Sequence, residues 1–310
     1  MRKLWYLKRG IIKLAVTKVS KNLGTLTIKE VEYNIAKDII VKNHYSKKWN
    51  TSFGKINIGI FKDNKLLGVA VFGNLMNPNS HNKITDLGRS SVIELNRLWI
   101  DDELGHNAET ILLGASFKII KHSYPHIKFV QSFADGRLGC GTIYKASNFK
   151  YYGYSKSLFF EDIETGEVFH KVPLENTKRP QGFLVKNKKY LENKLKPFYV
   201  KTYRYIYLLD KKENCKLEEQ GYPKYEKGII ETTFKHPNSL LSRLYIMYNE
   251  IGEYTLRDKC YRLITSGLKE NDRLSDIIDK QNKSESVNWF KNDYLSNPKN
   301  KEKIKNMLTR

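Results

Sequence analysis

Residues 92–120, VIELNRLWIDDELGHNAETILLGASFKII, constrain the fold more than any other part of the chain. The first part is typical of a buried strand near residues 92–100, and the apolar spacing of the last part predicts a helix near 107–122. The turn between them carries Asp102 and Glu103, whereas a turn that holds phosphate at a helix N-terminus often offers glycines and basic groups. The segment therefore predicts a sheet with a helix packed on it, and its turn argues against a phosphate ligand.

The flanking segments predict further elements. Apolar runs on both sides of Asp63 and Asn64 predict a β-hairpin. Residues 27–44 have helical spacing, with Thr27 as the N-cap and Glu30 three residues later. The other expected elements are strand-like segments in 1–27, a loop at 74–91, strands near 127–135, 149–161, 166–172 and 203–209, and a short helix near 142–147. We therefore expect an α+β fold with a mixed, mainly antiparallel sheet flanked by helices, and a small helical extension after residue 228.

The composition predicts a polyanionic partner. Lys and Arg number 55 against 33 Asp and Glu, which gives a net charge of +22. This charge favours nucleic acid or an anionic membrane surface, and a Lys-rich protein from an AT-rich genome is the alternative. No apolar run reaches transmembrane length, so we expect no membrane partner. Three distant cysteines signal neither a zinc site nor disulfides, and they fit a reducing cytoplasm.

A basic stretch at residues 178–216 is the expected DNA contact. It holds twelve Lys and Arg against three acids, interleaved with tyrosines. This mixture favours contact with the DNA backbone, although a solvated charge run is usual for a Lys-rich surface. The expected DNA-binding residues are Lys47, Lys48, Arg179, Lys186, Lys188, Lys189, Lys201 and Arg204.

The order of hairpin, strand, turn, helix, strand and short helix resembles the core of the GNAT acyltransferases. Residues 144–149, YKASNF, are similar to a signature that these enzymes carry on a later helix. The resemblance implies an acyl-coenzyme pyrophosphate at the turn before the main helix. Here that turn reads DELGHNA, and its two carboxylates would repel a pyrophosphate. Acyl-CoA is therefore a doubtful donor, and the sequence does not identify the donor of the group.

Four blocks narrow the resemblance. They are NHYSKKW, VIELNRLWIDDELGHNAETILLGASFKIIK, VQSFADGRLGCGTIYKASNFKYYG, and KTYRYIYLLDKK followed by YPK. Together they resemble the Mom-type DNA adenine-modification proteins of bacteriophages, over roughly residues 44–224. The resemblance implies that residues 1–228 form a GNAT-like catalytic domain, which converts the exocyclic N6 amine of adenine to a carbamoylmethyl-type adduct and shields phage DNA from host restriction enzymes. It implies double-stranded DNA as the partner, a flipped adenine and the host cytoplasm as the location. Residues 229–310 lie outside the resemblance and could add DNA contacts.

Three residues are the catalytic candidates. Asp135 ends a predicted strand and could accept the proton of the amine; the alternative is a turn-forming Asp whose side chain bonds nearby amides. Tyr144 could donate a proton or orient the base, or it could pack in the core. His44 could act as a base at the rim of the site or favour the dipole of the preceding helix. With nearby carboxylates His44 could also form a metal site, although the sequence carries no strong metal motif.

Six further residues are expected to contact the substrate or the donor: Tyr45, Glu94, Asn96, Arg97, Asn107 and Ser116. Period two in the strand puts Glu94 and Asn96 on one face and Arg97 on the other. A charge in a central strand needs a partner, so an internal brace between Arg97 and a carboxylate competes with a substrate contact. Tyr45 could stack on the base, Asn107 could cap its helix or face the donor, and packing is the default role of Ser116.

Two other functions compete with adenine modification. The first is a DNA-binding protein without enzymatic activity that kept an acyltransferase-like fold, which predicts salt-dependent DNA binding without a new nucleoside. The second is an acyl-CoA-dependent N-acyltransferase, which predicts measurable binding of acetyl-CoA. The sequence does not determine the oligomeric state.

Overall fold

The computed structural model describes residues 2–8, 11–46, 48–172, 180, 193–225, 239–266, 268 and 272–308. Contacts between residues divide the chain into two compact units. The first unit comprises residues 1–155 and 202–228, and the second comprises residues 156–201 and 229–310. The second unit therefore includes a central segment of the chain as well as the C-terminal residues beyond the expected boundary near 228.

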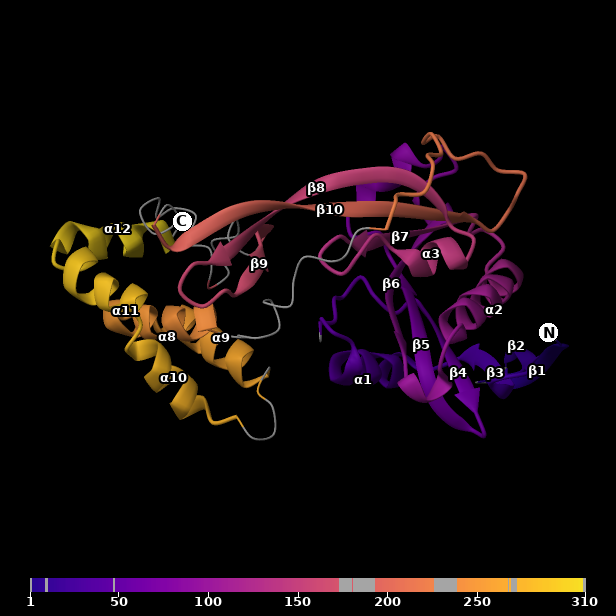
Figure 1. The fold of residues 1–310 in the computed structure, drawn as a ribbon, viewed down its shortest axis with the longest axis horizontal. Helices are drawn as coiled ribbons and strands as arrows, with labels where there is room; N and C mark the ends of the chain where they lie inside the picture. The colour runs from indigo at the N-terminus through magenta and orange to yellow at the C-terminus, as the bar shows by residue number, and fades with distance from the viewer. Residues whose placement is uncertain are drawn as a thin grey trace. The chain divides into compact units, whose positions relative to one another are not determined.

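A ten-stranded sheet has the order β1-β2-β3-β4-β5-β6-β7-β10-β8-β9, with the strands labelled in Figure 1. The strands are β1 Arg2–Lys8, β2 Ile11–Ser20, β3 Gly24–Glu30, β4 Ile56–Lys62, β5 Lys65–Gly73, β6 Val92–Ile100, β7 Phe129–Asp135, β8 Lys150–Asp162, β9 Val168–His170 and β10 Leu195–Leu208. Among the strand pairs whose register is described, β6 and β7 run parallel and the others run antiparallel. The expected mixed, mainly antiparallel sheet is thus confirmed.

Helices cover both faces of the sheet in the first unit. These helices and short turns are α1 Tyr33–Asn43, α2 Ala108–Ser123, α3 Thr142–Ala146, η1 Pro78–Lys83, η2 Arg89–Ser91 and η3 Asp102–Leu104. Helix α1 packs with Val69 and Val71 of β5 in one apolar cluster. Helix α2 belongs to the main core, which includes Ala70 and Phe72 of the same strand. Neighbouring residues of a strand point to opposite faces, so α1 and α2 lie on opposite sides of the sheet.

The expected strand–turn–helix unit and the hairpin are confirmed. Strand β6 spans the expected residues, and α2 begins one residue later than expected. Asp63 and Asn64 have φ angles of 49° and 64°, which suit a two-residue turn between antiparallel strands. The expected helix start at Thr27 is wrong, because residues 24–30 form β3 between β2 and β4. Burial of the alternating apolar residues of β3 in the sheet contributes more to stability than a helix cap at Thr27 would contribute.

The second unit packs helices and parts of β8, β9 and β10 around a separate core. Its elements after residue 238 are α8 Ser239–Ile251, α9 Tyr254–Thr265, α10 Leu274–Asn282, α11 Glu285–Trp289, the π-helical turn η4 Phe290–Tyr294 and α12 Pro298–Leu308. The apolar faces of α8 and α9 meet through residues such as Leu244, Met247 and Cys260. The helical C-terminal part is thus confirmed. None of the helices in the described ranges is long and apolar enough to cross a membrane.

Candidate active site

A β-bulge in β6 brings three polar residues to one face of the sheet. The pairing of β5 with β6 skips Asn96, so this residue is extra. Leu95 before the bulge and Leu98 after it both pack against the main core on the α2 side. An extra residue shifts the alternation of side chains by one. Arg97 therefore shares the α1 face with Glu94, which corrects the expectation that the two point to opposite faces.

Arg97 presents a guanidinium that takes part in none of the ion pairs of the described residues. It lies 4.6 Å from the ring centre of Phe53, and its Nη1 donates a hydrogen bond of 2.6 Å to the carbonyl of Asn96. Its Nε is buried without a hydrogen-bond partner in the described part of the chain. The expected carboxylate brace is thus not formed among the described residues, and the buried Nε is left without an acceptor there.

Glu94 is held by amides. Its two oxygens accept hydrogen bonds from Asn96 Nδ2 at 3.0 Å, from Gln131 Nε2 at 3.1 Å and from the backbone N–H of Met76 at 3.3 Å. Burial raises the pKa of Glu94, and these hydrogen bonds and the charge of Arg97 oppose the rise. Glu94 is 4% exposed, so we assign it to positioning Asn96 and the loop after β5.

Strands β6 and β7 part beside these residues. Their parallel pairing ends at Glu94 and Gln131, although both strands continue beyond that pair. The hydroxyl of Ser132 lies 3.0 Å from the carbonyl oxygen of Leu95 and 3.0 Å from the hydroxyl of Tyr144. Burial raises the pKa of Tyr144 to about 12. Tyr144 therefore keeps its proton at neutral pH and acts through hydrogen bonds.

His44 and Tyr45 follow α1, and their rings pack at a tilt of 34° with centres 4.2 Å apart. The Nδ1 atom of His44 accepts a hydrogen bond of 3.1 Å from the backbone N–H of Ser46. This contact leaves the proton of the neutral ring on Nε2. Tyr45 is 47% exposed, yet loss of hydration around its phenol raises its pKa, and the charge of Asp135 adds to the rise while Arg97 opposes it. The pKa of Tyr45 therefore responds to the charges of both Asp135 and Arg97.

Asp135 is bound by a neighbour that the sequence analysis did not select. Arg137 Nε lies 3.0 Å from both carboxylate oxygens, and its Nη2 lies 2.5 Å from Oδ2. The backbone N–H of Arg137 also donates to Oδ1 at 3.0 Å, as a turn-forming Asp would accept it. The ADGR sequence was the available signal, since an arginine two residues after an aspartate can fold back on it through a turn.

The structure thus brings seven of the nine expected catalytic and substrate residues into one region: His44, Tyr45, Glu94, Asn96, Arg97, Asp135 and Tyr144. Ser116 is fully buried, and its hydroxyl donates to the carbonyl of Leu112 at 2.7 Å, so it packs within α2. Asn107 precedes α2 with a φ of 70° and makes no side-chain cap. No group of three His, Cys, Asp or Glu in the described ranges is arranged to hold a metal ion.

Most of the expected DNA contacts lie outside the described residues, namely Lys47, Arg179, Lys186, Lys188 and Lys189. Lys48 is exposed, and Lys201 is partly exposed on β10. Arg204 lies 5.6 Å from the ring centre of Phe133, and its Nε is buried. Arg204 therefore has a packing role in the sheet. Lys48 and Lys201 stay candidates for phosphate contacts.

His44 predicts a pH-dependent stability. Burial and then the charge of Arg97 lower its pKa from 6.5 to about 4. As the pH falls, His44 is therefore protonated in the unfolded chain before it is protonated in the folded protein. The contribution of neutral His44 to the free energy of unfolding is complete above about pH 6.5. It is lost as the pH falls toward 4, by about 3 kcal/mol in all. We expect urea unfolding, followed by circular dichroism between about pH 7 and pH 4.5, to show a larger loss of stability in the wild type than in His44→Gln. The same loss in both proteins would contradict the buried neutral His44.

These features define an α+β protein with a polar site where two parallel strands part. The pattern of the Mom protein family matches residues 25–224. Methylcarbamoylase Mom of Escherichia phage Mu is 32% identical over 209 residues, which cover 64% of this chain and 84% of that protein. The chain therefore belongs to the Mom protein family.

Solved acetyltransferases align with part of the chain. The ribosomal-protein-S5-alanine acetyltransferase of Vibrio fischeri is 8% identical with a TM-score of 0.36, covering 63% of this chain and 98% of that chain. A GNAT-family acetyltransferase of Streptococcus pneumoniae is 13% identical with a TM-score of 0.34, covering 60% of this chain and 99% of that chain. The family membership rests on the sequence matches.

Proposed function

We propose that this protein is an enzyme that transfers a carbamoylmethyl-type group to the N6 amine of adenine in DNA and so protects phage DNA from host restriction enzymes. The observation that carries the proposal is the convergence of Tyr45, Arg97, Asp135 and Tyr144 where β6 and β7 part. Membership of the Mom family and the name of its phage Mu relative, a methylcarbamoylase, support a group transfer. The net charge of +22 supports a polyanionic substrate.

The adenine amine sets the requirements of the site. Its lone pair is delocalised into the ring, so the enzyme has to expose the base, align the donor and remove a proton as the bond forms. We assign the exposed ring of Tyr45 to stack on the flipped base, with the ring of His44 packed against it at a tilt of 34°. Since Nδ1 of His44 is occupied by Ser46, His44 would offer its Nε2–H as a donor and would not act as the base.

Arg97 and Tyr144 would hold the group to be transferred. The partly exposed guanidinium of Arg97, which is in no described ion pair, suits a carbonyl or anionic oxygen. Tyr144, which keeps its proton, would bind the same group as a neutral hydroxyl. In the step itself, a bond forms between N6 and the electrophilic carbon of the donor, the leaving group departs with its electron pair, and the N6 proton moves to Asp135. Arg137 would keep the carboxylate of Asp135 in place.

Nucleoside mass spectrometry tests the function directly. DNA from cells that express the protein should yield a modified deoxyadenosine with the mass of a carbamoylmethyl-type adduct. Unmodified deoxyadenosine alone, with folded protein present in the cells, would overturn the proposal. It would leave the DNA-binding protein without enzymatic activity as the better description.

Asp135→Asn is expected to lower the yield of modified deoxyadenosine at least about 100-fold. An amide oxygen can still accept the backbone N–H of Arg137, but it cannot take the amine proton. Asp210→Asn is the matched control, because Asp210 of the same unit forms an ion pair of 3.0 Å with Lys128 and has a similar exposure of 27%. Full activity of Asp135→Asn, or an equal loss in Asp210→Asn, would remove Asp135 as the base.

An acyl-CoA-dependent N-acyltransferase is the second candidate. The turn before α2 would repel a phosphate group less than its two acidic residues indicate. Glu103 forms an ion pair of 2.5 Å with Lys65 of the hairpin. The helix N-terminus also lacks the side-chain cap by Asn107 that the sequence suggested, so that side chain does not occupy its first N–H groups. Calorimetry with acetyl-CoA separates the candidates: binding without a new nucleoside in DNA favours the acyltransferase, and a new nucleoside without such binding favours adenine modification.

A further inference from the structure

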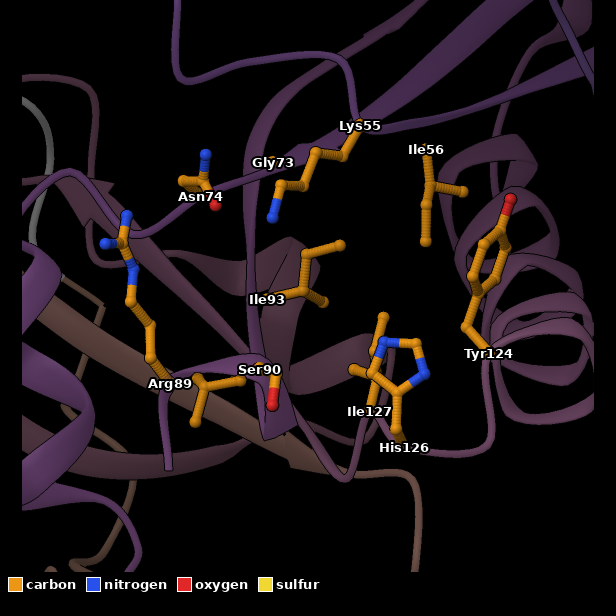
Figure 2. Close-up of a pocket in the computed structure, with 11 residues that line it drawn as sticks. Lys55, Ile56, Gly73, Asn74, Arg89, Ser90, Ile93, Tyr124, His126 and Ile127 are labelled. Carbon is orange, nitrogen blue, oxygen red and sulfur yellow. The ribbon is translucent and has the colours of Figure 1, made fainter. Parts of the chain in front are cut away.

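A cavity of about 700 Å³ lies in the first unit, on the α2 side of the sheet. Figure 2 shows its wall, which is built from the start of β4, the end of β5, the start of β6, and the segment after α2. Its lining residues are Lys55, Ile56, Gly73, Asn74, Arg89, Ser90, Val92, Ile93, Tyr124, His126 and Ile127. None of these residues is a candidate active-site residue, although the carbonyl of Asn74 accepts a hydrogen bond of 3.4 Å from Asn96 of that site.

The rim of the cavity carries two basic side chains that no acid of the described residues pairs with. Lys55 and Arg89 are exposed, and neither side chain forms an ion pair or hydrogen bond within the described part of the chain. By contrast, other lysines of the same unit are paired with acids, for example Lys65 with Glu103 and Lys150 with Glu219. Figure 2 shows the ammonium of Lys55 extending into the space beside Asn74, with the guanidinium of Arg89 on the other side of that residue. Two unpaired cations at one opening favour an anion.

The far wall of the cavity is aromatic and apolar. The rings of Tyr124 and His126 meet edge to face with centres 6.5 Å apart, and Ile93 and Ile127 lie between them and the basic rim in Figure 2. The hydroxyl of Tyr124 donates to Glu30 at 3.2 Å. This carboxylate and the negative end of the α2 dipole lie on the Tyr124 side, so an anionic group is favoured at the Lys55 and Arg89 side.

We propose that this cavity is a nucleotide-binding site. Lys55 and Arg89 bind the phosphate, and the sugar and base lie against Tyr124, His126 and Ile127. A cavity of about 700 Å³ falls within the range of about 300–1,000 Å³ that small-molecule sites occupy. The nucleotide has two possible sources, a free mononucleotide or a nucleotide of the DNA substrate, and only the second rests on the proposed function.

Binding measurements on the full-length protein test the site. The probes are deoxyadenosine monophosphate and a fluorescent duplex oligonucleotide, and the variant is Lys55→Ala/Arg89→Ala. We expect at least a tenfold loss of affinity for one of them. Loss of mononucleotide binding identifies a free nucleotide, whereas loss of duplex binding alone identifies a nucleotide of DNA. If duplex binding is lost, the slope of the logarithm of the binding constant against the logarithm of the salt concentration should also fall, by an amount equal to about two phosphate contacts.

The matched control is Lys21→Ala/Lys37→Ala, which removes two exposed lysines of the same unit far along the chain from the cavity. It changes the net charge equally, so an equal loss of affinity in the two double variants would show a general charge effect and overturn the site. Unchanged binding of both probes in Lys55→Ala/Arg89→Ala would overturn it as well. If DNA from expressing cells still carries the modified nucleoside in either case, the proposed function stands without the cavity.

A second measurement does not depend on the folding of the double variant. His126 is one of seven histidines, and its ring proton signal in the NMR spectrum can be assigned with His126→Gln. Saturating mononucleotide or duplex should shift this signal and leave that of His170, in the second unit, in place. A His126 signal that stays unshifted while the ligand is bound would contradict the site.

Discussion

Arg97→Met is expected to lower the yield of modified deoxyadenosine in cellular DNA by about 100- to 1,000-fold, which is the usual loss when one preorganised donor to a developing charge is removed. The wild-type guanidinium has an unpartnered buried Nε and is in none of the described ion pairs. Its removal therefore breaks no described ion pair, and Glu94 loses the favourable charge of Arg97 but keeps its hydrogen bonds from Asn96, Gln131 and Met76. Methionine fills similar space over Phe53, which lies 4.6 Å from the guanidinium, so the fold should persist.

The control for this variant is Arg257→Met in the second unit. Arg257 also lies 4.6 Å from an aromatic ring centre, that of Tyr254, but it is remote in sequence from every candidate site residue. Nucleoside mass spectrometry should detect wild-type yields in Arg257→Met and a strong loss in Arg97→Met. Arg97→Lys should restore only part of the yield, because a lysine keeps the charge but not the planar fork. Full activity of Arg97→Met would exclude a direct role of Arg97 in the transfer.

Arg243→Ala is expected to destabilise the second unit by about 3–5 kcal/mol, the usual effect of breaking a buried ion pair from one side. Arg243 on α8 is 0% exposed, and its partner Asp162 at the end of β8 is 1% exposed. Its Nη1 also donates to Ser286 at 3.0 Å and to Glu164 at 3.4 Å. Without Arg243, the carboxylate of Asp162 stays buried without its cation, and α8 and α11 lose a shared contact.

Hydrogen exchange measured by mass spectrometry checks this prediction unit by unit. Peptides from α8 and α11 should exchange faster in Arg243→Ala, while peptides from β4 and β5 should exchange at the wild-type rate. Arg257→Ala is the matched control, because its pair with Asp258 is exposed and is expected to contribute less than about 1 kcal/mol. Equal protection of α8 in Arg243→Ala and the wild type would show that the buried pair does not hold the unit together.

The local order of the first unit followed from the sequence. The alternation in residues 92–100, the helical spacing after residue 107 and the Asp63–Asn64 turn are short-range signals, and each produced the expected element. The same short-range reasoning failed at Thr27, where pairing with β2 and β4 decided the conformation. Local propensity is a weak prior, and sheet pairing overrides it.

The sequence by itself determined the family of the protein, its excess of positive charge and most of the residues that meet at the candidate site. Only the tertiary structure decided how those residues are used. The bulge at Asn96 turned Arg97 toward Glu94, the turn after β7 closed Arg137 on Asp135, and the ends of four segments enclosed the cavity beside Lys55. The physical reason is that a one-residue shift in strand register, a turn and a cavity depend on contacts between distant segments, which a pattern of neighbouring residues does not contain.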